Sequence, residues 1–270
     1  MLKQFPITRW FVVTVTLLTL GVVTPTAADD YDDCSQEVNT DVQIQGCTKL
    51  IEAGTEKGNN LAIVYYNRGV GYRAKGDHDR AIADFDKAIQ INPDLAVAYF
   101  FRGSIYGENG FYNRAVADFD KTIEINPVGA FAALAYVFRG RVYREKGDYN
   151  RAISDFDKAI QFRPDDADAY FHRGTANSKK GDYNRALADF DKAIQISPDD
   201  AFAYNNRGIV YRKKGLYDRA IADFDKAIQI NPNDAPAYYN RGNAYRNTGD
   251  TKQAAADCST AKQIDPSIDC

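Results

Sequence analysis

The chain has 270 residues, a formal net charge of −3 and 26% charged residues, which are ordinary values for a globular protein. Its two histidines are too few for a multi-histidine metal site, and its slight acidic excess argues against nucleic acid, whose phosphates require basic partners. The 18 tyrosines and 15 phenylalanines are enough for a sizeable core and for an aromatic binding surface as well.

Residues 1–28 have the features of a cleavable secretory signal peptide. Lys3 and Arg9 precede a mostly apolar stretch over residues 10–23, and residues 26–28, Thr-Ala-Ala, are the small residues typical of a cleavage site. The apolar stretch is shorter than the roughly 20 residues that cross a bilayer. We therefore expect an exported protein, periplasmic or secreted, with no membrane span in the mature chain. An uncleaved N-terminal membrane anchor is the alternative.

Residues 29–61 follow as an N-terminal cap and linker. Within them, residues 43–53 reproduce the apolar spacing of a helix that recurs later in the chain, with Ile44, Cys47 and Ile51 at the apolar positions. A stack of repeats must cover its terminal apolar face. We therefore expect this segment to be a degenerate half-repeat that caps the first full one.

An internal repeat of 34 residues organises the rest of the chain. The dipeptide Arg-Gly, a second glycine seven residues later and a closing proline recur at this period, and the third unit carries a three-residue insertion. The six units cover residues 62–95, 96–129, 130–166, 167–200, 201–234 and 235–268, and residues 269–270 form a C-terminal tail.

Each unit is predicted to be a helical hairpin. In the first unit Tyr65 and Tyr72 share one helical stripe, and Phe85 lies on a second. Gly-Asp at 76–77 separates the two stripes as a turn and helix N-cap. Asn-Pro at 92–93 ends the second helix, because proline lacks the backbone donor and restricts the residue before it.

This arrangement resembles the tetratricopeptide repeat (TPR) family, whose small, aromatic and proline residues recur at fixed positions of each unit. In the first unit the matching residues are Gly69, Tyr72, Ala81, Phe85, Ala88 and Pro93. The fourth position carries tyrosine in every unit where the family prefers tryptophan, and the seventh carries arginine instead of leucine. The resemblance implies an all-α fold: a right-handed α-solenoid of helix-turn-helix hairpins, six repeats plus an N-terminal capping helix.

A cation and an anion also recur at fixed positions of the repeat. The arginine of Arg-Gly lies on each first helix, and an aspartate lies on each second helix, at 84, 118, 155, 189, 223 and 257. So uniform a set is predicted to form structural ion pairs within or between neighbouring hairpins.

The four cysteines fall as one pair at each end of the repeats, Cys34 with Cys47 and Cys258 with Cys270. Exported proteins commonly form disulfides, and the two ends of a solenoid are too far apart to be cross-linked. We therefore predict two structural disulfides with these pairings. Each closes a short loop and is expected to stabilise its end of the stack by about 3 kcal/mol.

In TPR proteins the first helices line a concave groove, so the resemblance implies which side chains face a partner. Repeats one to four present an apolar and aromatic surface there, and repeats five and six a polar and cationic one. Amides pair with an extended backbone, and arginine binds carboxylates. The alternative is that several of the aromatic side chains pack between hairpins. The candidate partner-binding residues are Tyr66, Val97, Phe100, Val137, Phe171, Asn205, Asn206, Arg212, Asn240, Asn243 and Arg246.

No nucleophile, base and acid can be combined into a catalytic set. His78 and His172 stand at positions that other repeats fill with tyrosine, asparagine or phenylalanine, so both are interpreted as repeat variants. We predict a non-enzymatic scaffold, with no cofactor and no metal, that binds a protein or peptide partner in its groove. The alternative is a structural subunit of an envelope assembly that uses its end or convex surfaces, and a third hypothesis is an enzyme with a solenoid-borne site.

Overall fold

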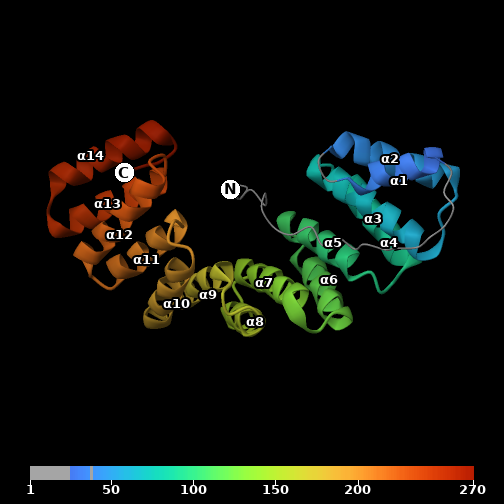
Figure 1. The fold of residues 1–270 in the computed structure, drawn as a ribbon. Coiled ribbons are helices and arrows are strands. Elements are labelled where there is room, and N and C mark those ends of the chain that lie inside the picture. Colours follow the sequence, from blue (N-terminus) through green and yellow to red (C-terminus); the bar gives the residue numbers. More distant parts are fainter. Residues whose placement is uncertain (1–24, 37–38) are drawn as a thin grey trace.

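The computed structural model describes residues 25–36 and 39–270. Within them the chain forms fourteen α-helices and no strand, and consecutive helices pair into hairpins. Figure 1 shows the hairpins stacked in chain order into an open arch, with α1 and α2 at one end and α14 at the other. The predicted all-α solenoid of helical hairpins is therefore confirmed. Of the predicted signal peptide, residues 1–24 lie outside the described part of the chain.

The first hairpin is the N-terminal cap, and the other six correspond to the six sequence units, although α3 begins at Gly58 and α7 at Gly129, before the starts of their units. The cap consists of α1 (Pro25–Ser35) and α2 (Thr40–Ala53). The repeats are formed by α3 (Gly58–Ala74) and α4 (His78–Ile91), α5 (Ala96–Glu108) and α6 (Tyr112–Ile125), α7 (Gly129–Glu145) and α8 (Tyr149–Phe162), α9 (Ala167–Lys180) and α10 (Tyr183–Ile196), α11 (Ala201–Lys213) and α12 (Tyr217–Ile230), and α13 (Ala235–Thr248) and α14 (Thr251–Ile264).

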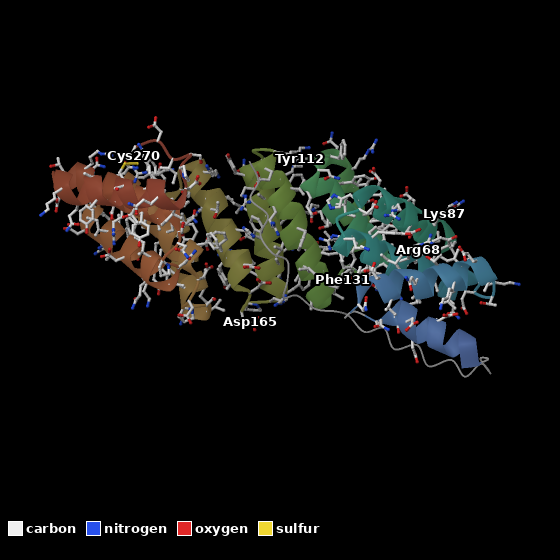
Figure 2. The ribbon with its side chains drawn as sticks, turned by 90° about the horizontal axis from the view of Figure 1, so that it is seen from above. Arg68, Lys87, Tyr112, Phe131, Asp165 and Cys270 are labelled. Atoms are coloured by element: carbon white, nitrogen blue, oxygen red, sulfur yellow. A yellow bond between two sulfur atoms is a disulfide. The ribbon has the colours of Figure 1, made fainter. Side chains whose placement is uncertain are left out.

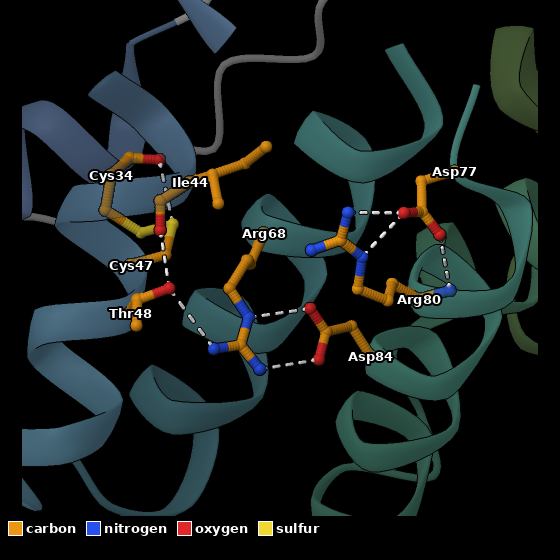
Figure 3. A network of polar contacts seen from close by, with 8 residues as sticks. All are labelled: Cys34, Ile44, Cys47, Thr48, Arg68, Asp77, Arg80 and Asp84. Carbon is orange, nitrogen blue, oxygen red and sulfur yellow. Dashed lines mark hydrogen bonds and ion pairs between the residues drawn. A yellow bond between two sulfur atoms is a disulfide. The ribbon is translucent and has the colours of Figure 1, made fainter. Parts of the chain in front are cut away.

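The N-terminal cap has one helix more than the sequence predicts. The expected capping helix is α2, and α1 packs along it, joined by the disulfide between Cys34 and Cys47 (Figure 3). The two helices approach closely at Gly46, where an added Cβ atom would lie 2.7 Å from the Cβ atom of Asp33. The sequence of α1 contains four aspartates and no apolar stripe, so its helical character is not evident from residue spacing.

The glycine of each Arg-Gly pair allows the two helices of a repeat to pack closely. An added Cβ atom at Gly140 would lie 2.8 Å from the Cε1 atom of Phe156, whose side chain is fully buried. The same contact recurs between Gly208 and Phe224, at 2.7 Å. Each of these repeats therefore has a small core around one phenylalanine ring, and any larger residue in place of the glycine would displace that ring.

The recurring arginines and aspartates form a ladder of ion pairs along the stack. Arg139 Nε and Nη2 donate to both carboxylate oxygens of Asp155 in the same repeat, at 2.9 and 2.6 Å. Arg139 Nη1 donates to Asp120 of the preceding repeat at 2.5 Å. The rings of Tyr136 and Tyr143 flank the guanidinium group, with their centroids 5.2 and 5.9 Å from its carbon. One side chain thus joins the two helices of its own hairpin and links that hairpin to the previous one.

The ladder ends in neutral side chains at both ends of the stack. Arg68 pairs with Asp84, but its Nη1 donates to the hydroxyl oxygen of Thr48 in α2 at 3.3 Å (Figure 3). In the last repeat Ser259 stands at the position that Asp225 holds one repeat earlier, and no further arginine follows it. Asp120 and Asp225 are examples of the aspartates that accept from the arginine of the following repeat. In the described repeats, such an aspartate occurs only where that arginine is present.

The turns within hairpins and the loops between repeats lie on opposite edges of the solenoid. Figure 2 shows Tyr112, at a turn within a hairpin, on one edge and Phe131 and Asp165, next to loops between repeats, on the other. At the C-terminal end the second predicted disulfide joins Cys258 to Cys270, with 6.0 Å between their Cα atoms. Among the described helices, none combines the length and apolar character needed to cross a membrane.

Candidate binding groove

The inner side of the arch is lined by the first helices of the repeats. Successive first helices from α5 to α13 contact one another directly, in addition to the second helices on either side. The second helices lie on the outer side, so the inner side is the shorter one (Figure 1). A curved stack of this kind has a concave surface to which every repeat contributes side chains.

Two of the predicted groove residues in the aromatic half are buried. Phe100 and Val137 are each 5% exposed. The Phe100 ring lies 5.0 Å from the ring of Phe138 and 5.5 Å from that of Phe131, measured between centroids. The three-residue insertion lengthens α7 to 17 residues and supplies Phe131 to this cluster. The prediction that Phe100 and Val137 face a partner is therefore corrected, because both side chains pack between hairpins beneath the surface.

The polar half of the groove is held by hydrogen bonds between its own side chains. Asn205 is 8% exposed and accepts a hydrogen bond from Asn240 Nδ2 at 3.0 Å, so it belongs to the α11–α13 contact and its predicted exposure is also corrected. Arg246 Nη1 donates to Asn243 Oδ1 at 2.8 Å. Arg212 has a buried Nε atom with no hydrogen-bond partner among the described residues. This half therefore presents oriented amides and guanidinium groups.

The other predicted residues remain accessible. Tyr66 and Phe171 pack one side of each ring on the hairpins, with centroids 5.7 Å from Phe101 and 5.9 Å from Phe190 respectively, and both side chains remain partly exposed. The accessible set, partly or fully exposed, consists of Tyr66, Val97, Phe171, Asn206, Arg212, Asn240, Asn243 and Arg246.

A charged cluster that the sequence analysis did not single out lies in the middle of the groove. Arg141 and Arg144 are three residues apart on α7, and His172 is on the neighbouring first helix, α9. Arg144 Nη1 lies 3.0 Å from His172 Nδ1, and the guanidinium carbon of Arg141 lies 5.1 Å from the centroid of the Phe138 ring. The sequence does contain a signal, because the ninth position of the repeat carries an arginine in the third unit alone.

The contact with Arg144 fixes the tautomer of His172. A guanidinium group can only donate, so Nδ1 of His172 accepts and the ring proton lies on Nε2. Burial, together with the nearby charges of Arg144 and Arg141, holds the pKa of His172 well below its usual value. The ring is therefore neutral at pH 7 and presents an Nε2–H donor. Burial and the charge of Arg144 also lower the pKa of Arg141.

The described residues bring together no group of three or more histidine, cysteine or acidic side chains suited to a metal ion. All four cysteines are in disulfides, and His172 is neutral and held by an arginine. The inner face instead offers guanidinium donors, amides and partly exposed aromatic rings. This chemistry suits the recognition of an extended polypeptide segment.

Most of the repeat region matches sequence profiles of one family. Three profiles described as tetratricopeptide repeat match residues 62–95 and 201–234, residues 96–128, and residues 224–256. A profile described as TPR repeat matches residues 140–181 and 178–215. No curated protein matches the chain significantly.

Several solved structures are similar in fold to this chain. A MamA structure is 29% identical in sequence and superposes with a TM-score of 0.56. The match covers 62% of this chain and 96% of the MamA chain. YrrB, described as a TPR protein with an unusual peptide-binding site, is 28% identical over 68% of this chain and 93% of its own, with a TM-score of 0.54. PilW, described as a type IV pilus biogenesis factor, shares the fold at 18% identity over 78% of this chain and 97% of its own, with a TM-score of 0.71.

Proposed function

Since the chain belongs to the tetratricopeptide repeat family, we propose that it is a non-enzymatic scaffold that binds an extended segment of a protein partner in its concave groove. The observation that carries this proposal is the contrast between the two faces of the solenoid. The second helices repeat nearly the same residues, with Ala-Asp-Phe-Asp-Lys at 83–87, 117–121, 188–192 and 222–226. The ninth position of the first helices, on the inner face, carries a different residue in every repeat: Val70, Ser104, Arg141, Thr175, Ile209 and Asn243.

This contrast separates a uniform second helix from a variable position of the first helix, at which Ser104 is buried and Val70 and Ile209 pack partly on the core. The second helices supply the ladder carboxylates and the buried phenylalanines that every hairpin needs, so their sequence is constrained by packing. No such constraint requires six different residues at one inner position. Variation of that kind is expected of a surface that recognises one particular partner.

The accessible residues indicate the character of the bound segment. Tyr66, Val97 and Phe171 offer apolar contacts in the first four repeats, and Asn206 and Asn240 offer amides in the last part of the groove. Amides supply both a donor and an acceptor to an extended backbone. YrrB, which is 28% identical, is described as having an unusual peptide-binding site, and this supports a peptide as the kind of partner.

We also propose that the protein acts outside the cytoplasm. The signal-like residues 1–28 and the two disulfides, one at each end of the stack, support export, since disulfides persist in oxidising compartments.

Site-directed photo-cross-linking in the native compartment tests the groove. The photoreactive amino acid p-benzoylphenylalanine is introduced at Phe171 or Asn206 on the inner face, and at the exposed Lys87 on an outer helix as the matched control (Figure 2). We expect a common cross-linked partner from both inner positions and none from Lys87. Cross-links from Lys87 with none from the inner positions would refute groove binding.

A second candidate function is a structural subunit of an envelope assembly that makes contact through an edge of the solenoid. Phe111 and Leu216 are 53% and 39% exposed at turns within hairpins, where the first repeat carries Asp77. Substituting both with aspartate would abolish such an assembly and leave the inner-face cross-links intact. The groove proposal predicts that the same double variant retains its partner.

A further inference from the structure

The charged cluster in the middle of the groove has hydrogen-bond donors without acceptors. Within the described residues the guanidinium group of Arg141 donates no hydrogen bond, although its side chain is half-buried over Phe138. The Nε2–H group of His172 likewise has no acceptor there. Neither group is among the fully buried side-chain atoms without a partner, so both remain open to an acceptor from outside the chain. A carboxylate would form charge-assisted hydrogen bonds with them in place of water.

The acidic side chains near the cluster do not supply this acceptor. Glu145 accepts from Arg144 Nη2 at 2.7 Å, and Glu108 accepts from Arg73 Nη2 at 3.1 Å. Asp168, at the start of α9, makes no ion pair with Arg141 and acts on it only through its charge. Of the three carboxylates near Arg141, two thus already accept from other arginines and the third is out of hydrogen-bond contact.

We infer that Arg141, Arg144 and His172 form a subsite for an aspartate or glutamate side chain of the bound segment, flanked in that segment by apolar residues. The inference rests on the proposed groove binding and adds the residue class that the centre of the groove selects. A carboxylate matches the planar donor fork of Arg141, and the Nε2–H group of His172 supplies another donor. The apolar neighbours would lie on the rings of Phe138 and Phe171, which border the cluster.

The flanking rings favour an acidic peptide as the occupant. The centroid of the partly exposed Phe171 ring lies 5.2 Å from that of His172, and the partly exposed Phe138 ring lies under Arg141, so accessible aromatic surface borders both donors. An isolated inorganic anion would use the guanidinium groups and leave these two rings without a contact. A peptide carboxylate with apolar neighbours uses both.

Selection of a random peptide library on the mature protein tests the inference. The wild-type protein is expected to enrich peptides that carry an aspartate or glutamate between apolar residues. Replacing that acid by its amide in an enriched peptide is expected to weaken binding to the wild type by about tenfold or more. Arg141→Gln is expected to lose this discrimination, while Asp168→Asn is expected to bind the acidic peptides more tightly, because it removes a competing negative charge.

The outcomes separate this inference from the proposed function. Enrichment of peptides with no acidic preference overturns the subsite and leaves groove binding intact, and failure to enrich any peptide overturns both. An acid-to-amide discrimination that Arg141→Gln leaves unchanged also overturns the subsite. Arg141 makes no hydrogen bond within the described residues, so this variant should fold normally, and thermal unfolding followed by circular dichroism checks this. Arg141→Lys, which keeps the charge but loses the planar fork, should restore only part of the discrimination.

Discussion

The ion-pair ladder makes a sharp prediction about which contacts stabilise the stack. Arg139→Met removes the guanidinium group but keeps much of the side-chain length, and so leaves Asp155 and Asp120 without their partner. Asp120→Asn removes only the charge that links Arg139 to the preceding repeat. The two substitutions therefore affect the same arginine at a buried and at an exposed contact.

The expected magnitudes differ because the two aspartates differ in burial. The side chains of Arg139 and Asp155 are 18% and 7% exposed, and removing one partner of a buried pair costs about 3–5 kcal/mol. The side chain of Asp120 is 53% exposed, so its pair with Arg139 is worth only about 0–1 kcal/mol. Burial acts to lower the pKa of Arg139, but its hydrogen bonds to Asp155 and Asp120 outweigh this and raise it, so the guanidinium group stays charged.

Urea unfolding of the chain without residues 1–28, followed by circular dichroism, measures these differences. We expect Arg139→Met to lower the free energy of unfolding by about 3 kcal/mol or more, and Asp120→Asn by less than about 1 kcal/mol. The double variant Arg139→Met with Asp155→Leu should recover most of the loss, because no buried charge is then left unpaired. A change in the slope of the transition would show that the stack unfolds in parts, in which case the total over all transitions is compared.

Two results would refute this reasoning. Equal losses for Arg139→Met and Asp120→Asn would mean that the exposed link between repeats, and not the buried pair, carries the stabilisation. A double variant no more stable than Arg139→Met would mean that the cost comes from lost packing and not from the uncompensated charge of Asp155.

Two further predictions concern the cap and the buried histidine. Replacing Cys34 and Cys47 by serine removes a cross-link between residues 13 apart in sequence. We expect this to lower the free energy of unfolding by about 3 kcal/mol in the same urea experiment. No change would show that the cap does not unfold with the stack. His172 stays neutral in the folded chain, whereas the unfolded histidine gains a proton near pH 6.5, so stability should fall as the pH drops through that value. This loss of stability on acidification should vanish in His172→Phe, the residue found at the matching positions 101 and 138. An unchanged pH dependence of the free energy of unfolding in the variant would contradict the assignment.

The period of the sequence was sufficient to predict the hairpins, their order and the pairing of the cysteines. It also predicted that the recurring arginines and aspartates pair, because residues at fixed positions of a repeat meet in the same way each time. The helix α1 was not predicted, since it belongs to no repeat and is recognised only by its close packing on Gly46 and its disulfide.

The groove was harder to predict because its exposure depends on how neighbouring hairpins stack. Phe100 and Tyr66 hold the same position of their repeats, yet Phe100 is buried and Tyr66 is partly exposed. The difference comes from Phe131, which the insertion places against Phe100. The cluster of Arg141, Arg144 and His172 likewise combines two repeats, and the contact between Arg144 and His172 spans 28 residues of sequence. Spacing within one repeat does not reveal such a neighbour.

The ladder explains how the groove can vary without loss of the fold. Each ladder arginine joins its own hairpin to the one before it, so the spacing of adjacent first helices is set by residues that do not face a partner. The fourth repeat shows that the ladder tolerates a local change. Asn177 replaces the tyrosine of the eleventh position there, and its Nδ2 donates to Asp189 at 2.9 Å, in addition to the bonds from Arg173. Under the proposed groove binding, stability and recognition therefore reside in different side chains of the same helices, and substitutions of accessible inner-face residues should change partner preference more than stability.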